Sequence, residues 1–312
     1  MELKVCFAGV GSIAKRHIRN LSSICEKRGI KLYIDALRHG DPKDKPEGIN
    51  HVFRDANEMP SDYDIIFITN PTSLHLESFI SLQEKGKHFF IEKPAVSFEQ
   101  IPEALNANIS CDGVVYVAGP LKFNAVIQYI KNNINPDDVI SVRSISSSYL
   151  PDWRPGTDYR NTYSAHKNLG GGVSIDLIHE WDYLTYLFGF PEEVMFMNGK
   201  KSDLEIDSDD YAIYLAEYKN KIAELHLDYF GRDTVREIEL ITKNGTVIGD
   251  IAHNKIRFLR TGEEIDFKEE RDDFQKREIE YFLNLTEKDT EAKNGFPDAL
   301  KLMGLTQGII RN

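Results

Sequence analysis

The sequence predicts an α/β Rossmann domain followed by an α+β domain with a large, mainly antiparallel open sheet. Up to about residue 119, apolar runs of strand length alternate with amphipathic runs of helix length, which is typical of a parallel sheet with crossover helices. A glycine-rich turn follows the first apolar run at Gly9. Beyond residue 119, longer segments of alternating polarity are separated by hairpin signals, as in antiparallel sheets.

The first domain is predicted to span residues 1–119. Ala14, Ile18, Leu21 and Cys25 recur at helical spacing, and Gly29 ends that helix. Further helices are expected over residues 73–85 and 97–106. The predicted strands are Leu3–Val10, Lys31–Arg38, Asp64–Thr69, His88–Ile91 and Gly113–Ala118.

The second domain is predicted to span residues 120–312, and the change of period alone sets this boundary. Its C-terminal helix is a candidate to pack back on the first domain. The predicted strands are Tyr211–Tyr218, Lys221–Tyr229 and Val235–Thr242, and the predicted helices are Phe123–Asn132, Gly172–Phe188 and Phe296–Ile310.

Length and charge restrict the class of protein. A chain of 312 residues exceeds the usual size of a single core, so two domains are expected. The 38 basic and 50 acidic residues give a net charge of −12, which argues against general binding to nucleic acid or to an anionic membrane. No apolar run approaches about 18 residues, so no membrane span is expected.

The three cysteines indicate a reduced, cytoplasmic protein. Cys6, Cys25 and Cys111 include no CxxC pair, and each is interpreted as an inert thiol buried in a strand or helix. The histidines lack the HExxH spacing, so no metal site is predicted. The N-terminal apolar run stops at Gly11 and is interpreted as a first strand, not an export signal.

The turn after the first strand carries the pattern Gly9-x-Gly11-x-x-Ala14. Gly9 permits a tight turn, Gly11 lets the backbone approach a pyrophosphate, and Ala14 lets the helix pack closely on the strand. The backbone from Gly9 to Gly11, Ser12 and Ile13 is therefore predicted to bind a dinucleotide at the helix N-terminus. The alternative is that these are merely small residues at a turn.

The end of the second predicted strand bears on the choice of nicotinamide cofactor. NAD-binding domains place an acidic residue there to accept the ribose 2′-hydroxyl. Arg38 and His39 occupy this position instead and would suit a 2′-phosphate. The cofactor is predicted to be NADP or NAD, with NADP preferred; the alternative is a solvent-exposed strand end.

Two further strand-end loops are expected to face the cofactor. One contains Thr69-Asn70-Pro71 with His75, and the other is Glu92-Lys93-Pro94. Ligands of open parallel sheets bind at the carboxyl ends of strands. Beside a positively charged nicotinamide, Lys93 could act as proton donor or electrophile. It could equally be a surface lysine before a proline.

A histidine and a carboxylate in the second domain are candidates for proton transfer. Asp176, His179 and Tyr183 follow i, i+3 and i+7, which places them on one face of the predicted helix. Asp176 could hold His179 in one tautomer and raise its basicity. A structural hydrogen bond is the alternative, although the preceding glycines, Gly170–Gly172, indicate a close backbone approach.

The segment before these glycines combines aromatic residues with arginines. It suits carbohydrate, because aromatic faces meet C–H groups and arginines hold carboxylate or phosphate. The alternative is a loop clamped onto the domain by its own Trp and Tyr residues. The predicted substrate-binding residues are Trp153, Arg154, Tyr159, Arg160 and Tyr163, together with Lys122.

Taken together, these motifs resemble the Gfo/Idh/MocA family of oxidoreductases over nearly the whole chain. The motifs stand in the family's order. They are Gly9-x-Gly11-x-x-Ala14 with His17, Thr69-Asn70-Pro71 with His75, Glu92-Lys93-Pro94, and Gly171-Gly172-x-x-x-Asp176-x-x-His179.

The resemblance implies an NAD(P)-dependent dehydrogenase or reductase acting on a hydroxyl or keto carbon of a sugar. It implies that Lys93 contacts the reacting hydroxyl and the nicotinamide ribose, that His179 is the general acid/base, and that Asp176 orients it and contacts substrate. It also implies a homodimer or homotetramer formed through the open sheet. The loop Tyr159–Tyr163 resembles a subgroup associated with nucleotide-linked or nonulosonic sugars.

Two departures from the family pattern, and several alternative functions, stand beside the resemblance. Lys122-Phe123 stands where the family often has Arg-Phe, and the acidic ribose contact is missing after the second strand. The alternative is a non-catalytic nicotinamide- or sugar-sensing regulator of the same fold, although Lys93, Asp176 and His179 are retained. Within enzymes, a retained-cofactor oxidoreductase and a redox-assisted glycosidase also remain open.

Overall fold

The computed structural model describes residues 2–38, 46–107, 109, 111–288, 290, 292 and 294–309. The chain divides into two compact units. The first comprises residues 1–118 and 275–300, and the second comprises residues 119–274 and 301–312. The chain thus leaves the first unit after residue 118 and returns to it near the C-terminus.

The first unit is built on a parallel sheet with the strand order β3-β2-β1-β4-β5-β6. Each pairing between neighbouring strands is parallel. The order reverses between β1 and β4, which is the position where open α/β sheets bind ligands. The strands are β1 (Glu2–Ala8), β2 (Lys31–Leu37), β3 (His51–Phe53), β4 (Tyr63–Ile68), β5 (Gly86–Ile91) and β6 (Val115–Val117).

Aromatic packing connects the centre of this sheet to a helix from the end of the chain. The rings of Phe7 and Phe67 stack with centroids 4.6 Å apart, and Phe90 stacks on Phe67 at 4.9 Å. Phe282 meets Phe90 edge-on at 5.4 Å. Burying such rings contributes about 1.5–3 kcal/mol each. The helices with residues in this unit are α1 (Ser12–Arg28), α2 (His75–Leu82), α3 (Ile101–Asn106), α7 (Asp273–Lys288) and α8 (Phe296–Leu305), of which α8 continues into the second unit.

The second unit contains an eight-stranded sheet in the described part of the chain, with the order β14-β13-β12-β11-β7-β10-β9-β8. All of its pairings are antiparallel except β7 with β10. Consecutive strands β10 and β11 run in opposite directions on either side of β7, so β7 must be parallel to one of them. The strands are β7 (Val139–Tyr149), β8 (Glu193–Gly199), β9 (Tyr211–Tyr218), β10 (Lys221–Asp228), β11 (Phe230–Thr242), β12 (Gly245–Asp250), β13 (Lys255–Phe258) and β14 (Glu264–Asp266).

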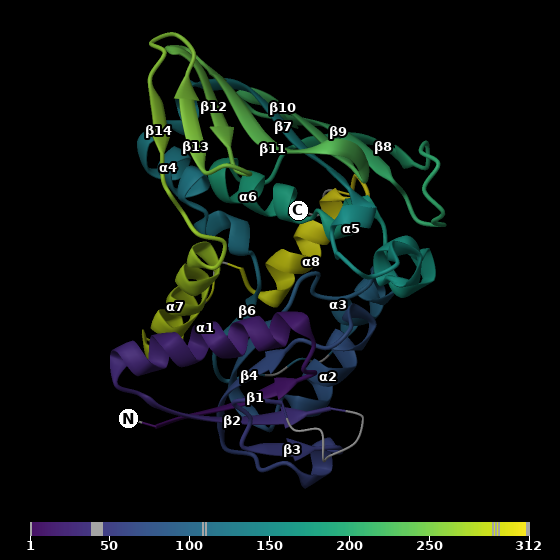
Figure 1. Cartoon of the computed structure of the whole chain (residues 1–312), viewed down its shortest axis with the longest axis vertical. Helices are drawn as coiled ribbons and strands as arrows, with labels where there is room; N and C mark the ends of the chain where they lie inside the picture. The colour runs from purple at the N-terminus through teal and green to yellow at the C-terminus, as the bar shows by residue number, and fades with distance from the viewer. Residues whose placement is uncertain are drawn as a thin grey trace. The chain divides into compact units, whose positions relative to one another are not determined.

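The helices of the second unit cover one face of this sheet (Figure 1). They include α4 (Ala125–Asn133), α5 (Val173–Asp176) and α6 (His179–Phe188). Trp181 of α6 is fully buried and meets the ring of Tyr214 on β9 edge-on at 5.3 Å. Along β9, buried residues alternate with exposed ones, as expected for a sheet that is covered on one face.

The predicted fold class is confirmed, and several predicted elements need correction. The helix expected over residues 172–188 is two helices, because Leu177, with φ −98° and ψ 29°, leaves the helical region. The tail helix ends at Leu305 rather than at residue 310. Cys111 is half-buried outside any helix or strand, whereas Cys6 and Cys25 are buried as predicted. Within the described residues, no helix has the length and apolar content to cross a membrane.

Candidate functional site

The turn after β1 is fixed by a close approach between two strand ends. Gly9 has φ +90°, and a Cβ there would lie 2.6 Å from the Cα atom of Asn70, so only glycine fits. The hydroxyl of Thr69 donates to the Gly9 carbonyl at 2.8 Å. The Gly9 amide donates to the carbonyl of Leu37 at 2.9 Å. The ends of β1, β2 and β4 are thereby connected at one edge of the sheet.

The start of α1 has the properties of an anion-binding site. Gly11 precedes the helix, and among the described residues no side chain caps its N-terminus and no atom lies within 4 Å of the position that a Gly11 Cβ would take. The first amides of a helix lack intrahelical partners and carry a partial positive charge. These features fit a pyrophosphate placed against Gly11, Ser12 and Ile13.

Arg38 follows β2 at the same edge of the sheet. It is half-buried, and its amide donates to the carbonyl of Phe53 at 3.1 Å, which extends the β2–β3 pairing by one residue. His39, the other residue predicted at this position, lies outside the described residues.

His75 joins the loops after β4 and β5. Its ring is buried, and its two nitrogens lie 2.9 Å from the carbonyl oxygens of Pro94 and Asn70. Burial lowers the pKa of His75, although the two carbonyls and the charge of Glu92 act in the opposite direction. His75 therefore holds the Thr69-Asn70-Pro71 loop against the Glu92-Lys93-Pro94 loop, which is a structural reason for its presence.

Glu92 forms a buried pair with His17 from α1. Its Oε1 atom lies 2.5 Å from Nε2 of His17, whose side chain is 1% exposed. Burial opposes ionisation, but the hydrogen bond and the charges of His17, Lys93 and His75 outweigh it and lower the pKa of Glu92. The second carboxylate oxygen accepts the amide of Lys93 at 3.2 Å. Glu92 thus fixes the backbone that presents Lys93.

Lys93 itself is half-buried and begins a cis peptide bond to Pro94. It follows β5, which lies next to β4 in the sheet. Because all strands of this sheet are parallel, Lys93 leaves the sheet at the same edge as Gly9 and Thr69. The residues predicted to bind the cofactor, where described, therefore gather at one sheet edge.

In the second unit, Asp176 is the centre of a buried polar cluster. Its Oδ2 atom accepts the hydroxyl of Tyr229 at 2.6 Å. The charge of Asp176 and a hydrogen bond between the two side chains raise the pKa of Tyr163, whose side chain reaches the surface. Burial and then the charge of Asp176 raise the pKa of Tyr229. Both phenols thus stay protonated at neutral pH and can act as donors.

His179 and Tyr183 lie on a different helix from Asp176. Asp176 ends α5, whereas His179 is the first residue of α6 and is half-buried. Tyr183 is fully buried and its hydroxyl lies 2.5 Å from Oγ of Ser144 on β7, so it points into the sheet. The predicted arrangement of three side chains on one continuous helix is therefore wrong, because the helix is interrupted at Leu177.

The glycines before α5 lie in close contact with other residues of the second unit. A Cβ on Gly171 would lie 2.1 Å from the carbonyl oxygen of Tyr163, and one on Gly172 would lie 2.2 Å from Oδ1 of Asp209. Gly172 also has φ +133°. The close backbone approach expected from these glycines is real, and its partners are the Tyr163 backbone and Asp209.

The aromatic loop is partly clamped to its own unit. Trp153 meets the ring of Tyr229 edge-on at 5.2 Å and donates from Nε1 to Ser148 Oγ at 2.9 Å. The guanidinium of Arg154 lies 5.3 Å from the centre of the Tyr163 ring. Trp153, Arg154 and Tyr163 therefore gather around the Asp176 cluster.

Two other predicted substrate residues have protein partners. Arg160 is exposed and pairs with Asp158 at 2.8 Å and Glu205 at 2.7 Å. Lys122 is buried with Asp182, their Nζ and Oδ1 atoms 3.3 Å apart. Burial raises the pKa of Asp182, although Lys122 acts in the opposite direction.

Sequence reasoning missed Tyr229, Asp209 and Asp182. Tyr229 ends a predicted strand, and nothing in the residues around it signals a partner 53 positions away. Asp182 follows Trp181 in α6 and carries no pattern beyond a polar residue in an amphipathic helix. A buried polar residue in an apolar segment is the only available signal.

Two family models match the chain. The first, an oxidoreductase family with an NAD-binding Rossmann fold, covers residues 3–118, and the second, the GFO/IDH/MocA C-terminal domain, covers residues 127–264. An uncharacterized oxidoreductase, YrbE, of Bacillus subtilis is 26% identical over 222 residues. That match covers 68% of this chain and 62% of YrbE, less than two thirds of the relative.

Solved structures agree with the fold. Levoglucosan dehydrogenase in complex with NADH and levoglucosan superposes with a TM-score of 0.83 at 16% identity, covering 99% of this chain and 96% of that one. WlbA dehydrogenase of Bordetella pertussis in complex with NADH and UDP-GlcNAcA gives a TM-score of 0.77 at 18% identity, covering 99% and 95%. With the two family models spanning both units, the chain belongs to the Gfo/Idh/MocA family of oxidoreductases, whose first domain is an NAD-binding Rossmann fold.

Proposed function

We propose that this protein is an NAD(P)-dependent dehydrogenase or reductase that acts on a hydroxyl or keto carbon of a sugar or sugar derivative. The observation that carries the proposal is the start of α1 at Gly11, which no described side chain caps, at the sheet edge from which Lys93 also emerges. A nicotinamide dinucleotide bound there would supply the hydride acceptor or donor. The residues of the chain would bind and orient the substrate and would exchange the proton with it.

Lys93 is proposed to contact the reacting hydroxyl and the nicotinamide ribose. The fixed backbone of Lys93 supports this role, because Glu92 accepts the Lys93 amide and is itself paired with His17. A cation beside the reacting oxygen would stabilise the charge that develops when the hydroxyl proton leaves.

His179 is proposed to take that proton during oxidation and return it during reduction. Its place at the start of α6, half-buried and three residues after Asp176 in the chain, supports an accessible imidazole. Asp176 is proposed to orient His179 and to contact substrate. Its bond from Tyr229 holds the carboxylate in place.

The substrate class is proposed from the residues near Asp176 and from the names of similar proteins. Trp153, Arg154 and Tyr163 offer aromatic faces and a guanidinium, which suit a sugar with polar or anionic substituents. Levoglucosan is a sugar derivative, and the WlbA complex contains a nucleotide-linked sugar. A nucleotide-linked or nonulosonic sugar is therefore within the proposed class.

The cofactor is proposed to be NADP in preference to NAD. Arg38, at the end of β2, supports this preference because a guanidinium pairs with a 2′-phosphate. The NADH complexes of levoglucosan dehydrogenase and WlbA concern those proteins and show that this fold also accommodates NADH.

A homodimer or homotetramer formed through the open face of the second sheet is also proposed. This face carries the exposed side chains of Met195 and Met197 on β8, which pair with exposed Leu215 and half-buried Ile213 on β9. Contiguous exposed apolar patches mark interaction surfaces. Light scattering coupled to size-exclusion chromatography should give two or four times the monomer mass, and a monomer at micromolar concentration would refute this point.

Retention of Lys93, Asp176 and His179 favours an enzyme over a sensor of the same fold. The test is a panel of neutral, N-acetylated, acidic and nucleotide-linked sugars, each with NAD or NADP, followed at the absorbance band of reduced nicotinamide. At least one sugar should be turned over, and Lys93→Ala and His179→Ala should each abolish the signal. Full activity of both variants would refute the assigned roles.

A further inference from the structure

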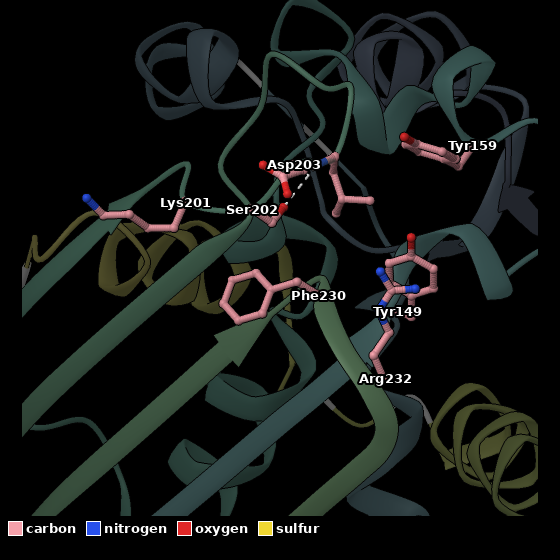
Figure 2. A pocket seen from close by; sticks show the side chains of 8 residues that line it. Tyr149, Tyr159, Lys201, Ser202, Asp203, Phe230 and Arg232 are labelled. Atoms are coloured by element: carbon pink, nitrogen blue, oxygen red, sulfur yellow. Dashed lines mark hydrogen bonds between the residues drawn. The ribbon is translucent and has the colours of Figure 1, made fainter.

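The second unit contains a pocket of about 320 Å³ away from the Asp176 cluster. This volume is within the range of small-molecule sites. Its lining residues are Tyr149, Tyr159, Ser202, Leu204 and Phe230, with the exposed residues Lys201, Asp203 and Arg232 at the rim. Figure 2 shows Phe230 between Lys201 on one side and the Tyr149–Arg232 pair on the other.

One wall is an aromatic surface with a cation stacked on it. The guanidinium of Arg232 lies 3.7 Å from the centre of the Tyr149 ring. Phe230 is the registered partner of Tyr149 across β11 and β7, and both are half-buried. A guanidinium on an aromatic face keeps its N–H edges available for a bidentate contact with a carboxylate or phosphate.

The opposite wall is held by a buried carboxylate. Asp210 is 0% exposed, and its Oδ1 atom accepts the amide of Lys201 at 2.8 Å. Its Oδ2 atom accepts the amide of Ser202 at 2.8 Å and the Ser202 hydroxyl at 2.6 Å. The segment that carries Lys201, Ser202 and Asp203 is therefore fixed.

The strand junction that presents Phe230 and Arg232 is also fixed. Oδ1 of Asp228 accepts the amides of Phe230 at 3.1 Å and Gly231 at 2.8 Å and the hydroxyl of Ser147 at 3.0 Å. A Cβ on Gly231 would lie 1.9 Å from Ser147 Oγ, so a larger residue here would displace the Ser147 side chain that donates to Asp228. The preceding residue, Tyr229, turns inward to Asp176, which separates the pocket from the cluster around Asp176.

Charge and shape together indicate the ligand. Aromatic surfaces of Tyr149, Phe230 and Tyr159 suit the C–H faces of a sugar ring. The stacked guanidinium of Arg232 offers a positive charge to an anionic substituent, whereas the side chain of Lys201 points away from Tyr149, Tyr159 and Arg232 (Figure 2). We propose that this pocket is a second binding site, which takes a sugar ring carrying a carboxylate or a phosphate.

The test is calorimetric titration of the whole protein, without cofactor, with glucuronate, glucose 6-phosphate, glucose and inorganic phosphate. The proposal expects one or both acidic sugars to bind at least about tenfold more tightly than glucose and than phosphate alone. The variant Arg232→Gln should weaken acidic-sugar binding by about tenfold, which corresponds to about 1.4 kcal/mol. Phe230→Ala should weaken all ring ligands and leave phosphate unchanged.

Arg257→Gln is the matched control, because Arg257 is an arginine of the same sheet that does not line the pocket. It lies on β13, with its Nη2 atom 3.8 Å from Oε1 of Glu237. This variant should bind like the wild type. Equal binding of glucose and the acidic sugars, no binding of either acidic sugar, or an unchanged affinity in Arg232→Gln would overturn the proposal. Preference for one acidic sugar identifies the anionic group. Turnover is not measured, so the outcome is independent of the proposed hydride transfer.

Discussion

The hydroxyl of Tyr229 donates to the buried carboxylate of Asp176 over 2.6 Å, across 53 positions of the chain. This bond joins the β10–β11 junction to the end of α5. It satisfies one oxygen of a carboxylate that is 4% exposed. A buried charge without a donor would be costly, so the bond fixes the conformation of the segment that precedes His179.

Replacing Tyr229 with phenylalanine should therefore destabilise the second unit. The loss expected for one hydrogen bond to a buried charge is about 1–3 kcal/mol in the free energy of unfolding. Tyr218→Phe is a matched control, because the buried Tyr218 hydroxyl has no hydrogen-bond partner among the described residues. Urea unfolding followed by fluorescence should shift for Tyr229→Phe alone, and equal shifts would contradict the importance of the bond.

The two glycines of the phosphate-binding turn should respond differently to alanine. Gly9→Ala should lower the free energy of unfolding by about 2 kcal/mol or more, since its φ is +90° and the new Cβ meets the Asn70 backbone. Gly11→Ala should leave stability unchanged, because φ −82° suits alanine and the space is open. It should weaken NADPH binding by about tenfold or more, seen by fluorescence titration.

If Gly11→Ala bound NADPH like the wild type, the pyrophosphate would not lie at this turn. Ser12→Ala is the control for the pair, because it changes the neighbouring side chain and keeps the backbone. Its binding should remain within about threefold of the wild-type value if backbone amides provide the main contacts.

The buried pair of Glu92 and His17 predicts a pH-dependent contribution to stability. The folded pKa of Glu92 lies below its unfolded value of about 4.3, so ionised Glu92 stabilises the fold above that pH. The contribution is lost as the pH falls through the folded pKa. Glu92→Gln should cost about 3 kcal/mol at pH 7, and the gap to wild type should narrow below about pH 4.

Urea unfolding from about pH 3 to pH 7 measures this gap. Glu99→Gln is the control, because Glu99 is exposed in the same unit, and its gap to wild type should stay near zero. A gap between wild type and Glu92→Gln that does not change with pH would show that the carboxylate charge is not the stabilising element.

Arg38 should decide the choice of cofactor. If it pairs with a 2′-phosphate, Arg38→Gln should lower kcat/KM for NADP by about tenfold or more and leave the value for NAD nearly unchanged. Arg19→Gln, an exposed arginine on α1, should change neither value. A wild type that prefers NAD, or an Arg38→Gln variant with unchanged NADP kinetics, would reverse the assignment.

The first unit could be predicted from sequence because its signals are local. The strand before Gly9, the turn itself and the helix ending at Gly29 occur within about thirty residues, and the observed β1, α1 and β2 follow that order. The helix α7 had no such signal. It belongs to the first unit from Gln275, and its Phe282 packs on Phe67 and Phe90, contacts that only the folded chain brings together.

The second unit could be predicted less completely, because its strand pairings join residues that are far apart in the sequence. Strand alternation indicated β9 and β10, but the position of β7 between β10 and β11 depends on pairing across about 80 residues. The break at Leu177 also lacked a proline or glycine to announce it. Motif residues such as Asp176 and His179 could be identified, whereas partners such as Tyr229 required the tertiary structure.

Transfer of deuterium tests the central claim most directly. A sugar that the panel identifies as a substrate should be prepared with deuterium on the reacting carbon and incubated with oxidised cofactor and protein. Direct hydride transfer predicts one deuterium on the nicotinamide ring of the reduced cofactor, detected by mass spectrometry, and one ketone formed per cofactor reduced. Reduced cofactor without deuterium, or no reduction with any sugar of the panel, would contradict the account.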